Sequence, residues 1–157
     1  MLKKRAVFIL LISLIVATVS FIFSQSMLPP ETSAAESEAV GGIIEEIIPP
    51  DTPAGAYVHK NLRKIAHFTE FAVLGVEIAI FVFLFMHRSA AVLLSYPLAI
   101  IIAFFDESIQ MFSRRGPSIF DVWIDFLGFF TFASITYVIF FAAEWLIFRL
   151  KKRKENL

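Results

Sequence analysis

Long apolar runs alternate with short polar segments along this 157-residue chain, which is 58% hydrophobic. Four runs are candidates for membrane-crossing helices, because about 20 apolar residues span the hydrocarbon core. They cover residues 6–23, 64–86, 90–105 and 126–143. Pro97 lies inside the third run and predicts a kink there. The pattern predicts an all-α integral membrane protein with four transmembrane helices.

The basic residues in the short flanks predict how these helices are oriented. Nine fall on one side: Lys3, Lys4, Arg5, Arg88, Arg149, Lys151, Lys152, Arg153 and Lys154. Five fall on the other: Lys60, Arg63, Lys64, Arg114 and Arg115. Cytoplasmic loops carry an excess of basic residues, so both termini are predicted to be cytoplasmic, an N-in and C-in topology in the cell membrane.

The composition of each segment predicts the domain organisation. Residues 1–23 form an N-terminal transmembrane anchor, predicted to be retained because no small-x-small cleavage site follows the apolar run. Residues 24–60 carry five prolines and six acidic residues, which predict an extracytoplasmic loop. That loop is either a flexible connector or includes an amphipathic helix over 37–48 that lies on the membrane. Residues 61–150 form a three-helix core, and 151–157 a basic cytoplasmic tail.

The second apolar run carries a polar stripe. Arg63, His67, Glu70 and Glu77 are spaced by four, three and seven residues, so they share one helix face. Ionisable residues at membrane depth are costly and usually face other helices or a polar cavity. The stripe is therefore predicted to point into the bundle. Snorkelling to the surface is the plain alternative for the residues at the helix end.

A second polar segment, residues 106–125, separates the third and fourth runs. Asp106 and Glu107 come near the predicted C-terminal end of a helix, where negative charge is unfavourable unless a cation compensates. Ser118 is predicted to be the N-cap of the fourth helix, with Asp121 three residues later in a capping-box spacing. Capping does not explain Asp125, which lies one turn deeper on the same face.

The predicted topology brings both polar segments to the same extracytoplasmic leaflet, so they form one candidate site. The candidate catalytic residues are His67, Glu70, Asp106, Glu107 and Asp125. The candidate binding residues are Arg63, Lys64, Gln110, Arg114, Arg115 and Asp121. The formal net charge is zero, so no basic field indicates a nucleic-acid partner. The chain has no cysteine, which excludes thiolate chemistry and cysteine-bound metals.

Three motifs in these segments resemble the VanZ-like family. They are Arg63-Lys64-Ile65-Ala66-His67-Phe68-Thr69-Glu70-Phe71, Asp106-Glu107-x-x-Gln110-x-Phe112 and Arg115-Gly116-Pro117-Ser118-x-x-Asp121-Val122-x-x-Asp125-x-x-Gly128. The resemblance covers residues 61–130, with Phe23-Ser24-Gln25-Ser26 after the first span. Many members carry histidine where this chain has Ile109, which leaves His67 as the histidine of the constellation. The resemblance implies an association with resistance to the lipoglycopeptide teicoplanin.

Three mechanisms remain open from the residues alone. The first is an enzyme that acts on a lipid-linked envelope precursor, with His67 and a carboxylate in acid-base roles and arginines that hold an anionic lipid headgroup. The second is a binding or organising protein in which the charges form a structural network. The third is a divalent-metal site, because His67 and Glu70 share a helix face and the aspartates could complete the ligand set. The expected partners are membrane lipids; the sequence specifies no cofactor.

Overall fold

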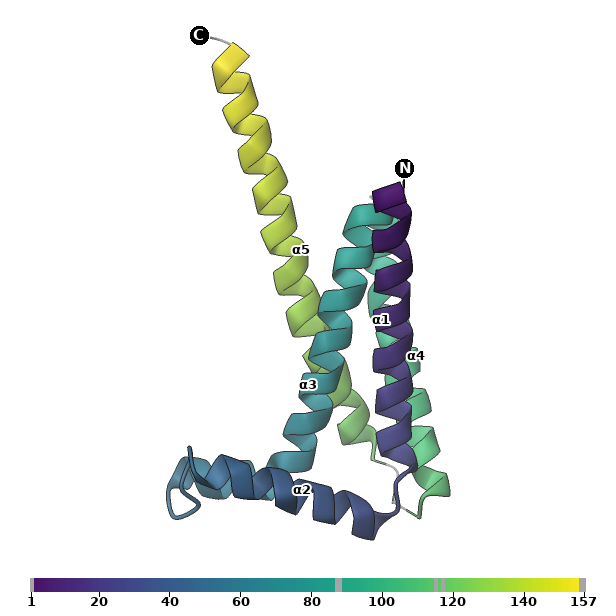
Figure 1. The fold of residues 1–157 in the computed structure, drawn as a ribbon, viewed down its shortest axis with the longest axis vertical. Coiled ribbons are helices and arrows are strands. Elements are labelled where there is room, and N and C mark those ends of the chain that lie inside the picture. The colour runs from purple at the N-terminus through teal and green to yellow at the C-terminus, as the bar shows by residue number, and fades with distance from the viewer. Residues whose placement is uncertain (1, 87–88, 115, 117, 156–157) are drawn as a thin grey trace.

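Helices dominate the computed structural model, which describes residues 2–86, 89–114, 116 and 118–155 and contains no strand among them (Figure 1). The helices are α1 (Leu2–Met27), α2 (Pro30–Glu45), α3 (Pro53–Phe85), α4 (Ser89–Phe112) and α5 (Ile119–Glu155). Four of them, α1, α3, α4 and α5, are long and apolar enough to cross a membrane. The prediction of an all-α protein with four candidate membrane-spanning helices is therefore confirmed, and these helices indicate a multi-pass membrane protein.

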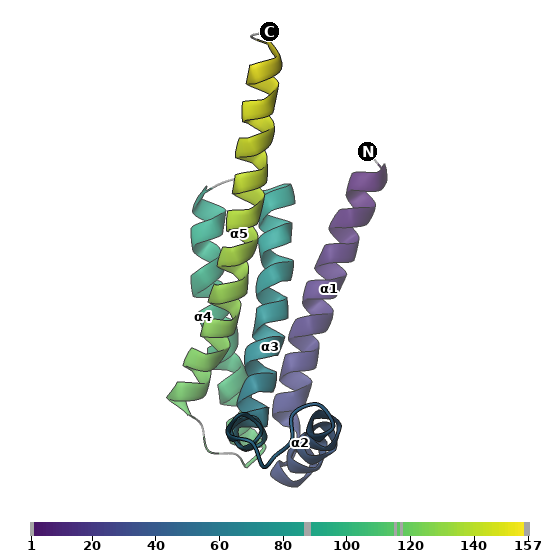
Figure 2. The same cartoon turned by 90° about the vertical axis from the view of Figure 1, so that its left-hand side faces the viewer.

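The four long helices form a bundle in which α3 is central. It packs most extensively against α5 and also contacts α1, α4 and α2. Figures 1 and 2 show α2 lying across one end of the bundle, while both chain termini lie toward the opposite end. The ends of the chain that carry the basic residues therefore lie far from α2.

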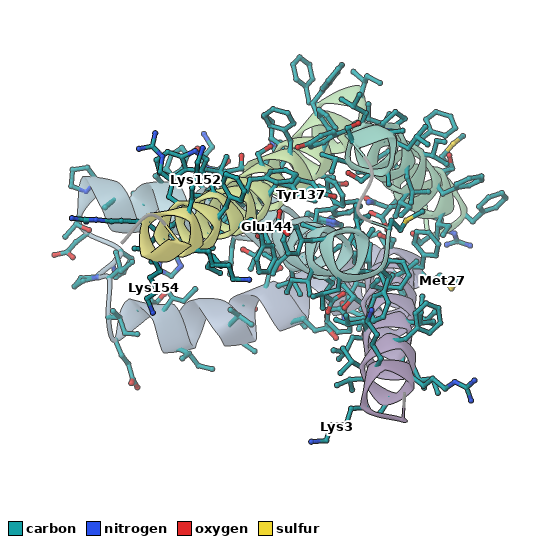
Figure 3. The ribbon with its side chains drawn as sticks, turned by 90° about the horizontal axis from the view of Figure 1, so that it is seen from above. Lys3, Met27, Tyr137, Glu144, Lys152 and Lys154 are labelled. Atoms are coloured by element: carbon teal, nitrogen blue, oxygen red, sulfur yellow. The ribbon has the colours of Figure 1, made fainter. Side chains whose placement is uncertain are left out.

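The C-terminal part of α5 extends beyond the other helices, and its side chains from Glu144 to Lys154 are exposed. Figure 3 looks down the bundle from this end and shows Lys152 and Lys154 on the projecting helix, well separated from Lys3 on α1. The helix continues through the basic segment that was predicted as a tail. Within it the Arg149 guanidinium lies 4.5 Å from the centroid of the Trp145 ring, in cation–π range.

Two glycines allow the backbones of α3 and α5 to approach closely. A Cβ atom on Gly128 would lie 2.2 Å from the carbonyl oxygen of Phe68, and one on Gly75 would lie 2.6 Å from that of Phe129. Small residues at such crossings are a common basis of helix association in membranes, where the hydrophobic effect adds little. Phe71, Leu74 and Phe129 fill the core beside the crossing and are fully buried.

The segment after the first span is more ordered than a loop. Pro30 starts α2 at its first turn, where the fixed φ of proline and its missing N–H carry no penalty. The following alanines and glutamates are good helix formers. A helix does form within residues 24–60, but it covers Pro30–Glu45 and not 37–48. Its position on the membrane surface stays a prediction. The flexible-connector interpretation is wrong for this part.

The long helices begin and end at other residues than the apolar runs that predicted them, and α3 and α4 show why. α3 begins at Pro53, because the Thr52 hydroxyl caps it by accepting a hydrogen bond from the Gly55 N–H at 3.0 Å. A non-helical residue, Asn61, then bends it before the apolar run starts. α4 continues through Pro97 to Phe112, about two turns beyond the apolar run that ends at residue 105.

Candidate functional site

Three long helices contribute side chains to a buried polar cluster near the α2 end of the bundle. Nδ1 of His67 on α3 lies 3.6 Å from Oδ2 of Asp106 on α4 and 3.8 Å from Oδ1 of Asp125 on α5. A further carboxylate oxygen, Oε2 of Glu70, lies 3.9 Å from the same nitrogen. Both aspartates are fully buried, and His67 is 9% exposed. The structure thus brings together four of the five residues that the sequence predicted as catalytic.

Helical spacing explains why these side chains meet. His67 and Glu70 are three residues apart and therefore lie on the same face of α3. That face points into the bundle as predicted, since Arg63 reaches α4 and Glu77 accepts a hydrogen bond from Thr18 of α1 at 3.0 Å. On α5, Asp125 precedes Gly128 by three residues, so the close crossing at Gly128 holds the aspartate against α3.

Gln110 connects Arg63 to a carboxylate of the cluster. The Arg63 guanidinium donates to Oε1 of Gln110, and Nε2 of Gln110 donates to Oδ2 of Asp106 at 3.3 Å. The glutamine is 2% exposed. Gln110 therefore lies between the positive charge of Arg63 and the carboxylate of Asp106.

Glu107 holds the start of α5. Its Oε1 accepts a hydrogen bond from the backbone N–H of Ser118, the residue just before that helix. The capping-box prediction assigned this N–H to Asp121, and it is wrong in its partner: the longer Glu107 side chain reaches the N–H from α4. Ser118 does precede the helix as predicted, and its carbonyl accepts from the Asp121 N–H at 3.0 Å.

Several carboxylate oxygens of the cluster have no hydrogen-bond partner among the residues that the structure describes. They are both oxygens of Asp125, Oδ1 of Asp106 and Oε2 of Glu70. Buried polar atoms are normally satisfied, and an unsatisfied charged group costs more than a neutral one. The cluster therefore has free capacity for a cation, for protons or for a hydrogen-bonding ligand. One ligand atom from each of His67, Asp106 and Asp125 falls within 4.8 Å of the others, a spacing that could hold a metal ion.

A groove of about 920 Å³ between α1, α2 and α3 reaches this cluster. Polar side chains such as Arg63, His67 and Glu70 and apolar ones such as Phe21 line it. Along α3 the lining residues follow in the order Arg63, His67, Glu70 and Val73, so the polar ones lie nearer to α2 and Val73 lies deeper in the bundle.

The other predicted residues differ in their placement. Lys64 and Arg114 are exposed, and Arg114 lies in the turn after α4 with a positive φ of 59°, so the structure does not bring either of them to the cluster. Asp121 is half-buried one turn from Asp125. Arg115 lies outside the described residues, as does Arg88.

Sequence reasoning did not assign a site role to Ser26 of α1. This serine is fully buried and lies within interaction range of Asp106, while its carbonyl accepts a hydrogen bond from the Ser113 hydroxyl at 2.8 Å. Gln25 beside it lines the groove. The available signal was the polar Phe23-Ser24-Gln25-Ser26 stretch, which falls within α1 and not after it.

Comparison with known proteins gives one match. A family model described as VanZ/LLP1 matches residues 8–143, most of the chain, and so includes α1 and every residue of the cluster. Searches of curated proteins and of solved structures gave no match. The family model agrees with the resemblance that the three motifs indicated. The chain therefore belongs to the VanZ/LLP1 family.

Proposed function

We propose that this protein binds a lipid or a lipid-linked envelope compound in the groove between α1, α2 and α3. The observation that carries the proposal is the order of side chains along that groove. Arg63, His67 and Glu70 line it near α2, whereas Phe21 and Val73 line it closer to the middle of the bundle. A lipid has the same order, with a polar headgroup at the interface and acyl chains toward the membrane centre.

The buried cluster favours a site that acts on its ligand, and it does not fit a network that only holds the helices together. A structural network is stable when every member is satisfied. Here both oxygens of Asp125 lack a partner among the described residues. His67 and Glu70 lie at the groove wall, within reach of a bound headgroup, and they supply an imidazole and a carboxylate for proton transfer. Arg63 supplies a cation for an anionic headgroup.

The proposed site faces the extracytoplasmic side of the cell membrane. The excess of basic residues at the two termini supports this orientation through the positive-inside rule. Both termini lie toward one end of the bundle, and the groove lies toward the other. A site at the outer leaflet fits the link to teicoplanin resistance that the family resemblance implies, because the lipid chain of a lipoglycopeptide commits it to the membrane surface.

Filling the groove is expected to remove the bound lipid. Ala66 is exposed and lines the groove, so Ala66→Trp places a bulky ring where the ligand would lie. Native mass spectrometry of the protein purified in mild detergent is expected to show one retained lipid on the wild type and background adducts on the variant. Ala142→Trp is the matched control, because Ala142 is exposed on α5 and is not among the groove residues. Equal lipid retention by all three proteins would contradict the proposal.

Labelling of introduced cysteines tests the orientation. The chain has no native cysteine, so each introduced thiol is unique. Ala35→Cys, exposed on α2, is expected to react with an impermeant maleimide added to intact cells. Ser89→Cys, exposed at the start of α4 and at the opposite end of the bundle, is expected to react only after the cells are permeabilised. Reaction at Ser89→Cys alone would place the groove on the cytoplasmic side.

A further inference from the structure

We infer that His67, Asp106 and Asp125 form a binding site for one divalent transition-metal ion, zinc or manganese. Their ligand atoms come from three different helices and lie within 4.8 Å of one another. Atoms that bind one ion at about 2.0–2.6 Å lie about 3–4.5 Å apart, so the observed separations of 3.6 Å and 3.8 Å from the imidazole nitrogen fit a common ion.

The aspartate oxygens provide an independent indication that a cation binds here. Asp125 is fully buried, and neither of its oxygens has a hydrogen-bond partner among the described residues. Oδ1 of Asp106 is in the same condition. A buried carboxylate with open lone pairs is normally paired or bound to a metal. A single divalent ion between the helices would satisfy both aspartates at once.

No lysine or arginine in the described part of the chain forms an ion pair with either aspartate, and the imidazole that lies near both of them belongs to His67, itself a proposed ligand. The Arg63 guanidinium is bound to Gln110, and the structure gives it no ion pair with either aspartate. Gln110 in turn donates to Oδ2 of Asp106 and so fixes that carboxylate. Hydrogen bonds of this kind orient metal ligands and tune their affinity. These hydrogen bonds thus orient Asp106 and still leave its Oδ1 and both oxygens of Asp125 without a hydrogen-bond partner among the described residues.

The mixture of ligand atoms indicates the class of ion. Imidazole nitrogen suits zinc and other transition metals, whereas magnesium and calcium prefer oxygen ligands alone. Glu70 lies 3.9 Å from the same nitrogen and is in position to join the ligand set. Since His67 and Glu70 also line the groove, a bound ion would lie at the groove wall and could act as a Lewis acid on a headgroup oxygen. The metal inference itself does not depend on a lipid in the groove.

The test measures metal binding by the full chain in detergent. Elemental analysis after purification is expected to find one zinc or manganese per chain. After treatment with EDTA, titration with zinc chloride or manganese chloride is expected to restore that stoichiometry and to raise Tm as the metal concentration increases, because a ligand of the native state stabilises it.

Two isosteric variants test whether these residues bind the ion. Asp125→Asn and Asp106→Asn keep side-chain size and are expected to weaken metal binding at least about tenfold. In metalloproteins, loss of a residue that only hydrogen-bonds to a metal ligand already weakens binding by about tenfold or more. Glu144→Gln, an exposed acid on α5, is the control and is expected to bind as the wild type does.

Circular dichroism and gel filtration check that each variant is folded. A wild type with no metal and no metal-dependent change in Tm would overturn the inference. So would aspartate variants that are folded and bind metal as tightly as the control. Because no lipid is measured, these outcomes are separate from the failure of the lipid proposal.

Discussion

Replacing Gly128 with alanine is expected to destabilise the bundle by about 3 kcal/mol, the upper part of the range for overpacked cores. The new methyl group would lie 2.2 Å from the carbonyl oxygen of Phe68, far inside van der Waals contact. The atom it meets belongs to the backbone of α3, so relief requires α3 and α5 to separate. Their separation would also pull Asp125 away from His67. Thermal unfolding in detergent, followed by circular dichroism, measures the loss.

Gly42 on α2 provides a control that should change stability in the opposite direction. A Cβ atom there would meet nothing within 4 Å. Gly42→Ala is therefore expected to stabilise by up to about 1 kcal/mol, because alanine loses less backbone entropy in a helix. Gly75→Ala is expected to act as Gly128→Ala does, since its methyl group would lie 2.6 Å from the carbonyl oxygen of Phe129. Wild-type stability of Gly128→Ala would contradict the close helix crossing.

The number of spans could be predicted from hydrophobicity, but the ends of the helices could not. α4 contains Asp106, Glu107 and Gln110 within its last turns, although charged residues after an apolar run usually indicate that a span has ended. They remain helical because other helices cover them: Gln110 binds Arg63, and Glu107 binds the Ser118 N–H. A single sequence does not show such tertiary partners.

The residues of the candidate site could be predicted from the sequence, but the contacts between them could not. Spacing on α3 identified His67 and Glu70, and the depth of Asp125 identified it as more than a helix cap. The sequence predicts a cation that compensates Asp106 and Glu107. Arg63 lies close enough to act on Asp106 electrostatically, but its hydrogen-bond partner is Gln110. Arg114 also differs, because a turn with positive φ leaves it exposed. Charge and spacing predict which residues are present, whereas helix rotation and side-chain length decide which atoms meet.

Loss of drug protection is the largest functional effect expected from the proposed site. If the groove binds a lipid-linked compound at the outer leaflet, overexpression is expected to protect more against a glycopeptide that carries a lipid chain, such as teicoplanin, than against one without. The chain commits the drug to the membrane surface, because each buried methylene adds about 0.8 kcal/mol of anchoring. Glu70→Gln and Asp106→Asn are expected to reduce protection to the level of empty vector, since both keep side-chain size and remove a charge from the cluster.

The measurement is a susceptibility comparison of wild type, both variants and empty vector, with membrane abundance determined in parallel. Glu144→Gln serves as the matched control and is expected to protect fully, because Glu144 is exposed on the projecting end of α5, away from the groove. Neutralising Asp106 removes a buried charge and keeps the shape of the side chain, so the folded protein should still accumulate in the membrane. Reduced protection at normal abundance would then reflect lost chemistry or binding. Full protection by Glu70→Gln and Asp106→Asn, or equal protection against both drug types, would leave the cluster with a structural role only.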